Sequence, residues 1–243
     1  MKLNNNTILI TGGTSGIGLA MAKRFISLHN KVIIAARSTD KLKAVKELLP
    51  QVETIQCDLS KPADIDKLVH TVEQEYPKLN VLINNAGVQY NYHFLTEADI
   101  HTKAIHEIDI NLTAPIRLTA HLLPLLEQNG DAAIVNVSSS LGMVPKANAP
   151  VYCGTKAGIH IFSKALRYQL KDTKVFEVVP ALVDTAMTQG RGKGKITPDQ
   201  LVDEFVRGFE RDKYEINIGK VKILRLLQRI APALADRIIS GKD

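Results

Sequence analysis

Residues 7–18 read Thr-Ile-Leu-Ile-Thr-Gly-Gly-Thr-Ser-Gly-Ile-Gly, a β-branched run that leads into a cluster of glycines. The run predicts a strand, and apolar residues at helical spacing from Gly16 onward predict a helix that starts inside the cluster. Glycines at such a junction let the backbone approach a phosphate, and the new helix offers it free N–H groups. A glycine-rich turn without a ligand is the alternative, but the position at the first strand–helix junction favours a dinucleotide site.

Short apolar runs alternate with helical stretches along the rest of the chain. The further runs cover residues 31–36, 52–56, 81–84, 132–137 and 174–179, and the predicted helices cover 16–28, 40–49, 63–75, about 99–128 and 151–170. This alternation indicates βαβ units with a parallel sheet, and runs that are apolar on both faces indicate helices on both sides. We therefore expect an α/β fold, a Rossmann-like doubly wound parallel β-sheet in three layers, in one domain over residues 1–243.

Composition excludes several classes of function. The 243 residues include 31 Lys and Arg against 25 Asp and Glu without a dense basic run, and aromatic residues make up only 5%, so nucleic-acid binding is not expected. Cys57 and Cys153 lie far apart with no second cysteine or histidine at metal-ligand spacing, so neither a disulfide nor a metal site is predicted. No secretion signal and no apolar run long enough for a transmembrane segment is found, which predicts a cytoplasmic protein.

The end of the second predicted strand bears on the choice of dinucleotide. The rule for such sites expects an acidic residue there to bind the ribose 2′-OH, but this chain has Ala36 followed by Arg37. An arginine can hold a 2′-phosphate through paired charge-assisted hydrogen bonds, so we expect NADP(H) to be preferred, with NAD(H) as the alternative. In that alternative Arg37 is a solvated residue at a helix entry, and Asp40 is the acid that binds the ribose.

Tyr152 and Lys156 are four residues apart in a predicted helix, so their side chains share one face. A lysine ammonium close to a phenol lowers the pKa of the phenol, which would bring Tyr152 toward the range useful for general acid/base catalysis. An ordinary exposed Tyr–Lys pair is the alternative interpretation.

Four motifs in this order resemble the short-chain dehydrogenase/reductase family, in its single-domain branch. They are TGGTSGIG at 11–18, NNAG at 84–87, VSSS at 137–140 and YCGTK at 152–156, and the similarity runs from about Thr7 to Thr185. The resemblance implies hydride transfer between a nicotinamide cofactor and a small-molecule carbonyl or alcohol substrate, in a homo-oligomer, either a dimer or a tetramer. A finer resemblance, in residues 1–18, 81–89, 180–188 and 217–232, is to DltE-type dehydrogenases.

The resemblance also implies the site residues. Tyr152 would donate or accept the proton, Ser139 would orient the substrate oxygen, Lys156 would hold the nicotinamide ribose, and Asn111 would support a water relay to Lys156. The implied cofactor-binding residues are Gly12, Thr14, Ser15, Gly16, Ile17, Gly18, Arg37, Asp58, Leu59, Asn85, Ala86, Gly87, Tyr152, Lys156, Val183 and Thr185. Two of the implied site residues have simpler structural interpretations. Asp58 could cap the following loop, and Asn111 could be a surface asparagine of a helix.

The C-terminal third has two features that bear on the site, a missing glycine after the last predicted strand and a polar, glycine-rich segment. Ala181 follows Pro180 where the family usually has glycine, so we expect a different turn there, because alanine lacks the freedom of glycine at positive φ. Residues 184–195 are polar, basic and rich in glycine, and the helix start at Thr197 has the pattern of a capping box, which predicts a lid at about 184–197.

Residues from about 219 to 240 form a basic amphipathic tail. Its apolar face could pack on the body, pair with a second subunit or lie on an anionic membrane. The tail supports an alternative function, in which the protein is a cofactor-binding sensor or scaffold that engages a membrane or a partner.

Overall fold

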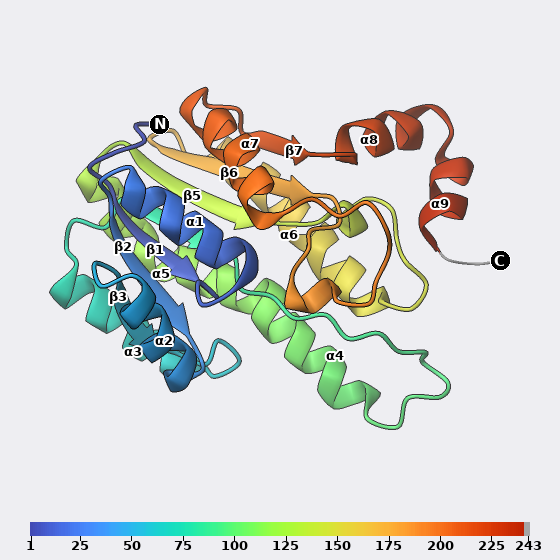
Figure 1. Cartoon of the computed structure of the whole chain (residues 1–243), viewed down its shortest axis with the longest axis horizontal. Coiled ribbons are helices and arrows are strands. Elements are labelled where there is room, and N and C mark those ends of the chain that lie inside the picture. The colour runs from blue at the N-terminus through green and yellow to red at the C-terminus, as the bar shows by residue number, and fades with distance from the viewer. Residues whose placement is uncertain (241–243) are drawn as a thin grey trace.

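The computed structural model describes residues 1–240 and has a seven-stranded parallel sheet at its centre (Figure 1). The strands are β1 (Thr7–Thr11), β2 (Lys31–Ala36), β3 (Glu53–Gln56), β4 (Val81–Asn84), β5 (Ala132–Val137), β6 (Thr173–Pro180) and β7 (Glu215–Ile218). Their order in the sheet is β3-β2-β1-β4-β5-β6-β7. The direction of winding reverses between β1 and β4, and this is where doubly wound sheets bind ligands at the carboxyl ends of their strands.

Helices cover both faces of the sheet, as predicted. One face packs against α1 (Gly16–Ser27), α2 (Thr39–Leu48) and α7 (Pro198–Glu210), and the other against α3 (Pro62–Glu75), α5 (Ala114–Asn129) and α6 (Pro150–Gln169). The core of the first face contains four fully buried phenylalanines, Phe25, Phe176, Phe205 and Phe209, whose neighbouring ring centroids lie 4.7–6.1 Å apart. These aromatic contacts pack α1 and α7 against each other and α7 against β6 of the sheet. The predicted three-layer α/β fold is therefore confirmed, although residues 241–243 of the expected domain lie outside the described residues.

The long helical stretch predicted near residues 99–128 is continuous but not uniform. It comprises α4 (Ile100–Ile108), a π-helical turn at Asp109–Thr113, and α5. The predicted start of α7 is confirmed, because the Thr197 side chain accepts from the Gln200 N–H while the Gln200 side chain accepts from the Thr197 N–H. Strand β7 was not predicted.

The turn after β6 is made without glycine. Ala181 is not among the residues with positive φ, and its N–H donates to the Ile218 carbonyl at 3.3 Å. The chain therefore leaves β6 while still paired with β7, and no residue at this turn needs the left-handed conformation.

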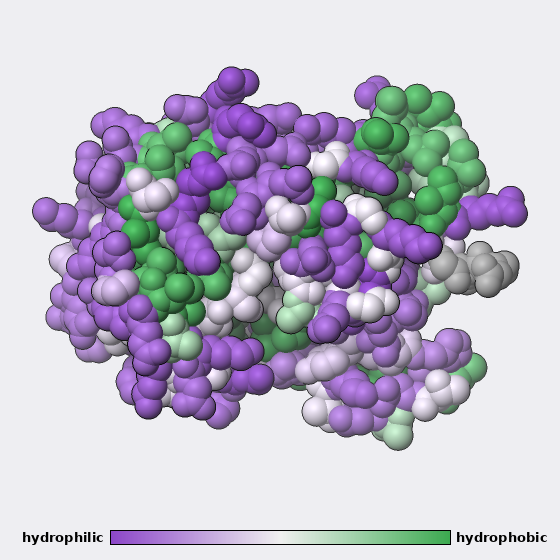
Figure 2. All heavy atoms as spheres, viewed as in Figure 1, coloured by the Kyte–Doolittle hydropathy of each residue, from purple (hydrophilic) through white to green (hydrophobic). Residues whose placement is uncertain are grey.

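The basic tail folds into two short helices, α8 (Val221–Ile230) and α9 (Pro232–Ser240). Figure 2 shows their apolar side chains gathered at the upper right of the molecule, where Ile223, Leu226 and Ile230 are more than half exposed. Other residues of the same helices, among them Leu224 and Leu227, line a cavity of the body. No helix within residues 1–240 has both the length and the apolar character needed to cross a lipid bilayer.

Candidate active site

Two adjoining cavities open at the carboxyl ends of the strands. The first is a groove of about 320 Å³ beside the glycine loop, and the second is a deeper cavity of about 550 Å³ that contains Tyr152. The cavities meet at a shared wall made of Ile17, Asn85, Gly87, Thr185 and Met187. Their position is the crevice that the strand order creates.

Most of the predicted cofactor-binding residues lie along the groove. Those that line it are Gly12, Thr14, Ser15, Gly16, Ile17, Arg37, Asp58, Leu59, Asn85, Ala86, Gly87 and Thr185. Gly12 has a φ of +68°, and a β-carbon there would lie 2.8 Å from the Ala86 Cα, so only glycine fits at this close approach. The groove therefore provides the kind of backbone cradle that a dinucleotide pyrophosphate needs beside the N-terminus of α1.

Three of the predicted cofactor-binding residues line only the deeper cavity. They are Tyr152, Lys156 and Val183. A fourth, Gly18, lines neither cavity. The space beside it is filled, since a β-carbon there would lie 2.5 Å from both the Gly12 carbonyl oxygen and Asn85 Nδ2. Gly18 thus serves close packing of α1 against the loop, and a direct contact with a ligand would have to come from its neighbours.

The far end of the groove is basic. Arg37 and Lys41 both line it, whereas Asp40, the alternative ribose-binding acid, does not. Asp58 also lines it, and its carboxylate accepts from the Ser60 N–H at 3.1 Å and the Ser60 hydroxyl at 2.8 Å. Partial burial raises the pKa of Asp58, but the Ser60 hydrogen bonds and the Arg37 charge outweigh it and hold the pKa below its usual value. Asp58 therefore both caps its loop and lines the groove.

Ser139, Tyr152 and Lys156 lie together in the deeper cavity. Tyr152 and Lys156 come from the first two turns of α6, and Ser139 follows β5. Tyr152 shares a side-chain hydrogen bond with Ser139. The Lys156 ammonium donates to the Val137 carbonyl at 2.8 Å and lies 5.7 Å from the centre of the Tyr152 ring.

Burial sets the protonation of this pair. It raises the pKa of Tyr152 to about 12, against the opposing effect of the Ser139 hydrogen bond. It lowers the pKa of Lys156 to about 8, while the negative charge of Glu177 acts in the opposite direction. The expectation of a lowered Tyr152 pKa is therefore wrong for the protein alone, because burial of the phenol outweighs the opposing effects of Ser139 and Arg191.

Asn111 lies in the π-helical turn, which places it beside the other candidate catalytic residues. It is buried, so the alternative of a surface asparagine is wrong. A β-carbon on Gly87 would lie 3.3 Å from Asn111 Oδ1 and 3.7 Å from Lys156 Nζ, so both side chains approach the same glycine. Turns of this type occur preferentially at functional sites.

Asn111 and Glu107 also hold the segment that follows β4. Asn111 accepts from the Val88 N–H and donates to the Val88 carbonyl, each at 2.8 Å. Glu107, which was not predicted, is fully buried and accepts from the Tyr90 N–H at 2.8 Å and the Tyr92 hydroxyl at 3.0 Å. One wall of the crevice is thus held to the helix by four hydrogen bonds.

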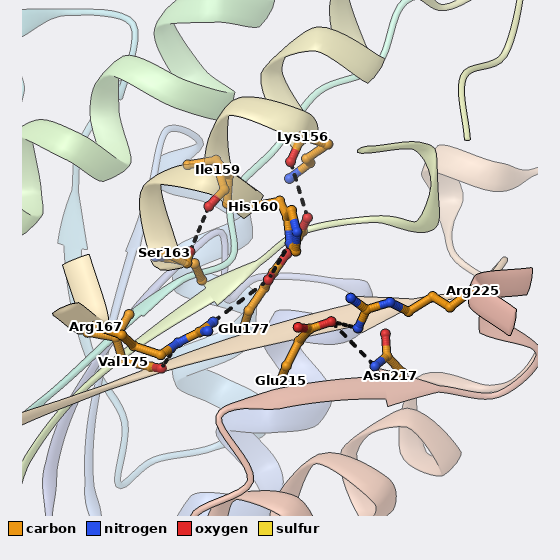
Figure 3. Close-up of polar contacts among 12 residues, drawn as sticks. Lys156, Ile159, His160, Ser163, Arg167, Val175, Glu177, Glu215, Asn217 and Arg225 are labelled. Carbon is orange, nitrogen blue, oxygen red and sulfur yellow. Dashed lines mark hydrogen bonds and ion pairs between the residues drawn. The ribbon is translucent and has the colours of Figure 1, made fainter. Parts of the chain in front are cut away.

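A row of polar residues crosses the sheet beneath the candidate active site. Asn84, Asn136, Glu177 and Glu215 occupy paired positions on four neighbouring strands. The Glu177 side chain is almost fully buried, and its Oε2 lies 2.8 Å from His160 Nδ1 and 3.9 Å from an Arg167 nitrogen (Figure 3). Glu177 was not predicted, because a glutamate inside an apolar run carries no signal of a partner.

Among residues 1–240, His160, Glu177 and Glu215 form the one group of three side chains whose ligand-type atoms lie close enough for a metal ion. Each carboxylate already faces a guanidinium group, Arg167 at Glu177 and Arg225 at Glu215 (Figure 3). The two pairs balance the charge of the cluster, so a metal ion is not needed to stabilise it.

Comparisons with known proteins agree with this geometry. A family model described as short chain dehydrogenase matches residues 6–195. The chain is 42% identical to "Uncharacterized oxidoreductase DltE" of Bacillus subtilis, over 93% of this chain and 92% of the relative. A short-chain dehydrogenase from Sphingobium yanoikuyae in complex with NADPH has a TM-score of 0.83 at 28% identity, with 98% of both chains covered. One from Burkholderia cenocepacia in complex with NADP has a TM-score of 0.88 at 22% identity, with 99% of this chain and 100% of that chain covered.

Proposed function

Because this chain belongs to the short-chain dehydrogenase family, we propose that it is an NADP(H)-dependent oxidoreductase that interconverts a small-molecule carbonyl compound and a secondary alcohol. The observation that carries the proposal is the placement of Ser139, Tyr152 and Lys156 in one cavity that shares a wall with the glycine-loop groove. That arrangement brings a proton donor next to the groove in which the dinucleotide would bind. In this proposal residues 1–243 act as one cytoplasmic domain, with 184–197 as a lid, and assemble into a homo-oligomer.

The groove residues fit the cofactor. The backbone at Gly12 and Gly16 would hold the pyrophosphate at the N-terminus of α1, and Asp58 and Leu59 would lie against the adenosine. Arg37 and Lys41 form a basic end suited to a 2′-phosphate, and no carboxylate follows β2 directly. These features favour NADP(H) over NAD(H).

Tyr152 is the proton donor in the proposed reduction. When bound, NADPH supplies the hydride that the carbonyl carbon receives. The Ser139 hydroxyl orients the carbonyl oxygen, and the Tyr152 hydroxyl gives it a proton as the negative charge develops. Because burial raises the pKa of Tyr152 to about 12, the phenol is protonated at neutral pH, which is the form that donates a proton in the reduction.

Lys156 and Asn111 keep Tyr152 ready for the next cycle. The Lys156 ammonium stabilises the tyrosinate that proton donation leaves behind, because its charge is held in the same buried space. Asn111 lies across Gly87 from Lys156 and would hold water on the path that returns a proton to Tyr152.

Thermal-shift titrations with NADPH and NADH test the cofactor, and Tyr152→Phe tests the mechanism. NADPH at about 100 times its Kd adds roughly 2.7 kcal/mol of stability. For a chain of this size that corresponds to a rise of roughly 5–10 °C in Tm. Tyr152→Phe should keep this rise and lose turnover by a factor of about 100 or more. Equal turnover of the variant would contradict the mechanism, and a rise in Tm without turnover of any carbonyl compound would favour the sensor or scaffold.

A further inference from the structure

The deeper cavity is apolar but carries only positive charge. Most of its wall consists of aliphatic side chains, among them Leu141, Leu182, Val183, Met187, Leu224 and Leu227. Beyond the candidate catalytic Lys156, its charged lining residues are Lys146, Arg191 and Lys220, and no Asp or Glu among the described residues lines it. An apolar space with an unbalanced positive charge favours a ligand that has an apolar body and a negative group.

Arg191 stands out among these cations because its guanidinium group is incompletely paired. Nη1 is buried and has no hydrogen-bond partner. A buried donor left without an acceptor costs free energy, and the cost disappears when a ligand supplies the acceptor. Lys220, by contrast, is an exposed residue at the edge of the cavity.

The lid holds Arg191 over the cavity. It lies between Gly190 and Gly192, which both have positive φ, and its N–H donates to the Thr188 carbonyl at 3.0 Å. Gly192 packs so closely that a β-carbon there would lie 2.5 Å from Leu182 Cδ2. The close contact of Gly192 with Leu182, which lines the cavity, therefore places the backbone beside Arg191 against the cavity wall.

The position of Arg191 relative to Tyr152 links it to the reacting end of a substrate. The positive charge of Arg191 acts on the Tyr152 phenol, where it opposes the effect of burial on the pKa. The nearest acid of the lid, Asp184, is largely exposed and already paired with Lys195 at 3.2 Å. Arg191 thus keeps a free charge within electrostatic reach of the proton donor.

The cofactor groove does not explain this charge. Arg191, Lys146 and Lys220 line the deeper cavity, whereas the groove has its own basic residues, Arg37 and Lys41. The two sets of cations are separated by the wall that contains Asn85 and Thr185. The positive charge of the deeper cavity is therefore available to the substrate.

We propose that the substrate is an anionic carbonyl compound, with an apolar chain between the carbonyl and a carboxylate or phosphate group, and that Arg191 binds the anionic group. This inference rests on the proposed function and adds the substrate class to it. The planar guanidinium group suits both anions, because it offers two parallel N–H donors to their oxygens. Lys146 and Lys220 add to the attraction at longer range.

A matched set of probes tests the proposal. The substrates are methyl-ketone carboxylic acids of increasing chain length, each compared with its own methyl ester and with the corresponding phosphate monoester. We expect kcat/KM for an anionic probe of suitable length to exceed that of its ester by about 10- to 100-fold, the range for a charge-assisted hydrogen bond. Arg191→Met should abolish this preference, because it should lower kcat/KM far more for the acid than for the ester.

Lys193→Met is the control, because it removes the same charge from an exposed residue of the same loop that does not line the cavity. It should keep the preference for the anion. The proposal fails if the native protein reduces esters as well as acids, if Arg191→Met affects acid and ester equally, or if Arg191→Met weakens NADPH binding in a thermal shift. The last result would assign Arg191 to the cofactor.

A binding measurement separates this proposal from the proposed function. The acid and its ester are titrated into the NADP⁺-loaded protein, and the rise in Tm is compared between native protein and Arg191→Met. If Tm rises with the acid but not with the ester, and Arg191→Met abolishes the rise, the anion site is supported. If Tm rises in this way but no probe is turned over, the anion site still stands and the proposed reaction is contradicted. Equal rises for acid and ester would overturn the anion site.

Discussion

His160 Nδ1 lies 2.8 Å from Glu177 Oε2, which ties α6 to the buried strand β6 one helical turn beyond Lys156. Residues 156 and 160 share a helix face, so the glutamate that His160 holds lies beneath the Lys156 ammonium (Figure 3). The other charged groups around Glu177 are Arg167 from α6 and the Glu215–Arg225 pair of β7 and α8. Glu177 is the buried anion whose charge acts on Lys156.

Glu177→Gln should move the pH profile of the enzyme. The substitution keeps the size of the side chain but removes a negative charge that raises the pKa of Lys156, so Lys156 loses its proton at a lower pH. We expect the alkaline fall of kcat/KM to shift to lower pH than in the native protein. Glu215→Gln, which changes a carboxylate already paired with Arg225, should leave the profile in place. Identical profiles for native protein and Glu177→Gln would show that Glu177 only supports the fold.

Lys156→Met should stabilise the protein while it abolishes activity. Burial lowers the pKa of Lys156 from 10.5 to about 8, so the unfolded chain holds this proton more tightly than the native state does. The native state therefore carries a cost below about pH 8, and this cost fades as the pH rises toward 10.5. The variant also loses the hydrogen bond to the Val137 carbonyl, which offsets part of the gain. We therefore expect the free energy of unfolding to increase by roughly 2–3 kcal/mol at neutral pH. Urea denaturation should show a smaller gain near pH 10, and destabilisation at neutral pH would contradict the prediction.

Arg37→Glu should reverse the cofactor preference. A carboxylate at the end of β2 repels a 2′-phosphate and accepts a hydrogen bond from a ribose 2′-OH. We expect the Kd for NADPH to rise by about 10- to 100-fold, with no loss of affinity for NADH. Calorimetric titration of both cofactors measures this. Lys43→Glu makes the same change of charge in α2 outside the groove, and a similar loss there would point to general electrostatics instead of a phosphate contact.

Gly142→Ala should damage the site and Gly154→Ala should not. A β-carbon on Gly142 would lie 2.7–2.9 Å from backbone atoms of Lys156 and Ala157, so the turn after β5 would have to move away from α6. We expect a loss of about 1–3 kcal/mol in unfolding free energy, together with lower kcat. Gly154 lies inside α6 with nothing within 4 Å of such a carbon, so alanine there should add about 1 kcal/mol. Thermal denaturation distinguishes the two, and equal effects would contradict the packing argument.

The parts of the fold that were predictable are those that depend on local sequence. The strands β1, β2, β4, β5 and β6 are apolar runs between helices of regular period, so their positions follow from pattern alone. Strand β7 reads Glu-Ile-Asn-Ile, which is short and half polar. It becomes a strand only because β6 offers an edge to pair with, and that is a tertiary effect.

Within the candidate site, the residues that were missed depend on distant partners. The role of Glu177 depends on His160 and Lys156, which lie on α6 and are close to it only in the folded chain. The position of Arg191 depends on the packing of Gly192 on Leu182. The pKa of Tyr152 was predicted in the wrong direction because the spacing to Lys156 reveals a charge but not the burial of the phenol. The positions of the motif residues could be predicted, because each motif lies at the end of a predicted strand or at the start of a predicted helix.

The π-helical turn fixes the rotational phase between α4 and α5. Each residue advances an α-helix by about 100°, so deletion of one residue from 109–113 would turn α4 by that angle relative to α5. Glu107 would then point away from Tyr90 and Tyr92, while the residues of α5 after the deletion kept their packing on the sheet. The length of this helix is thus as tightly constrained as the identity of Asn111, and insertions or deletions in the family should avoid this turn even where its other side chains vary.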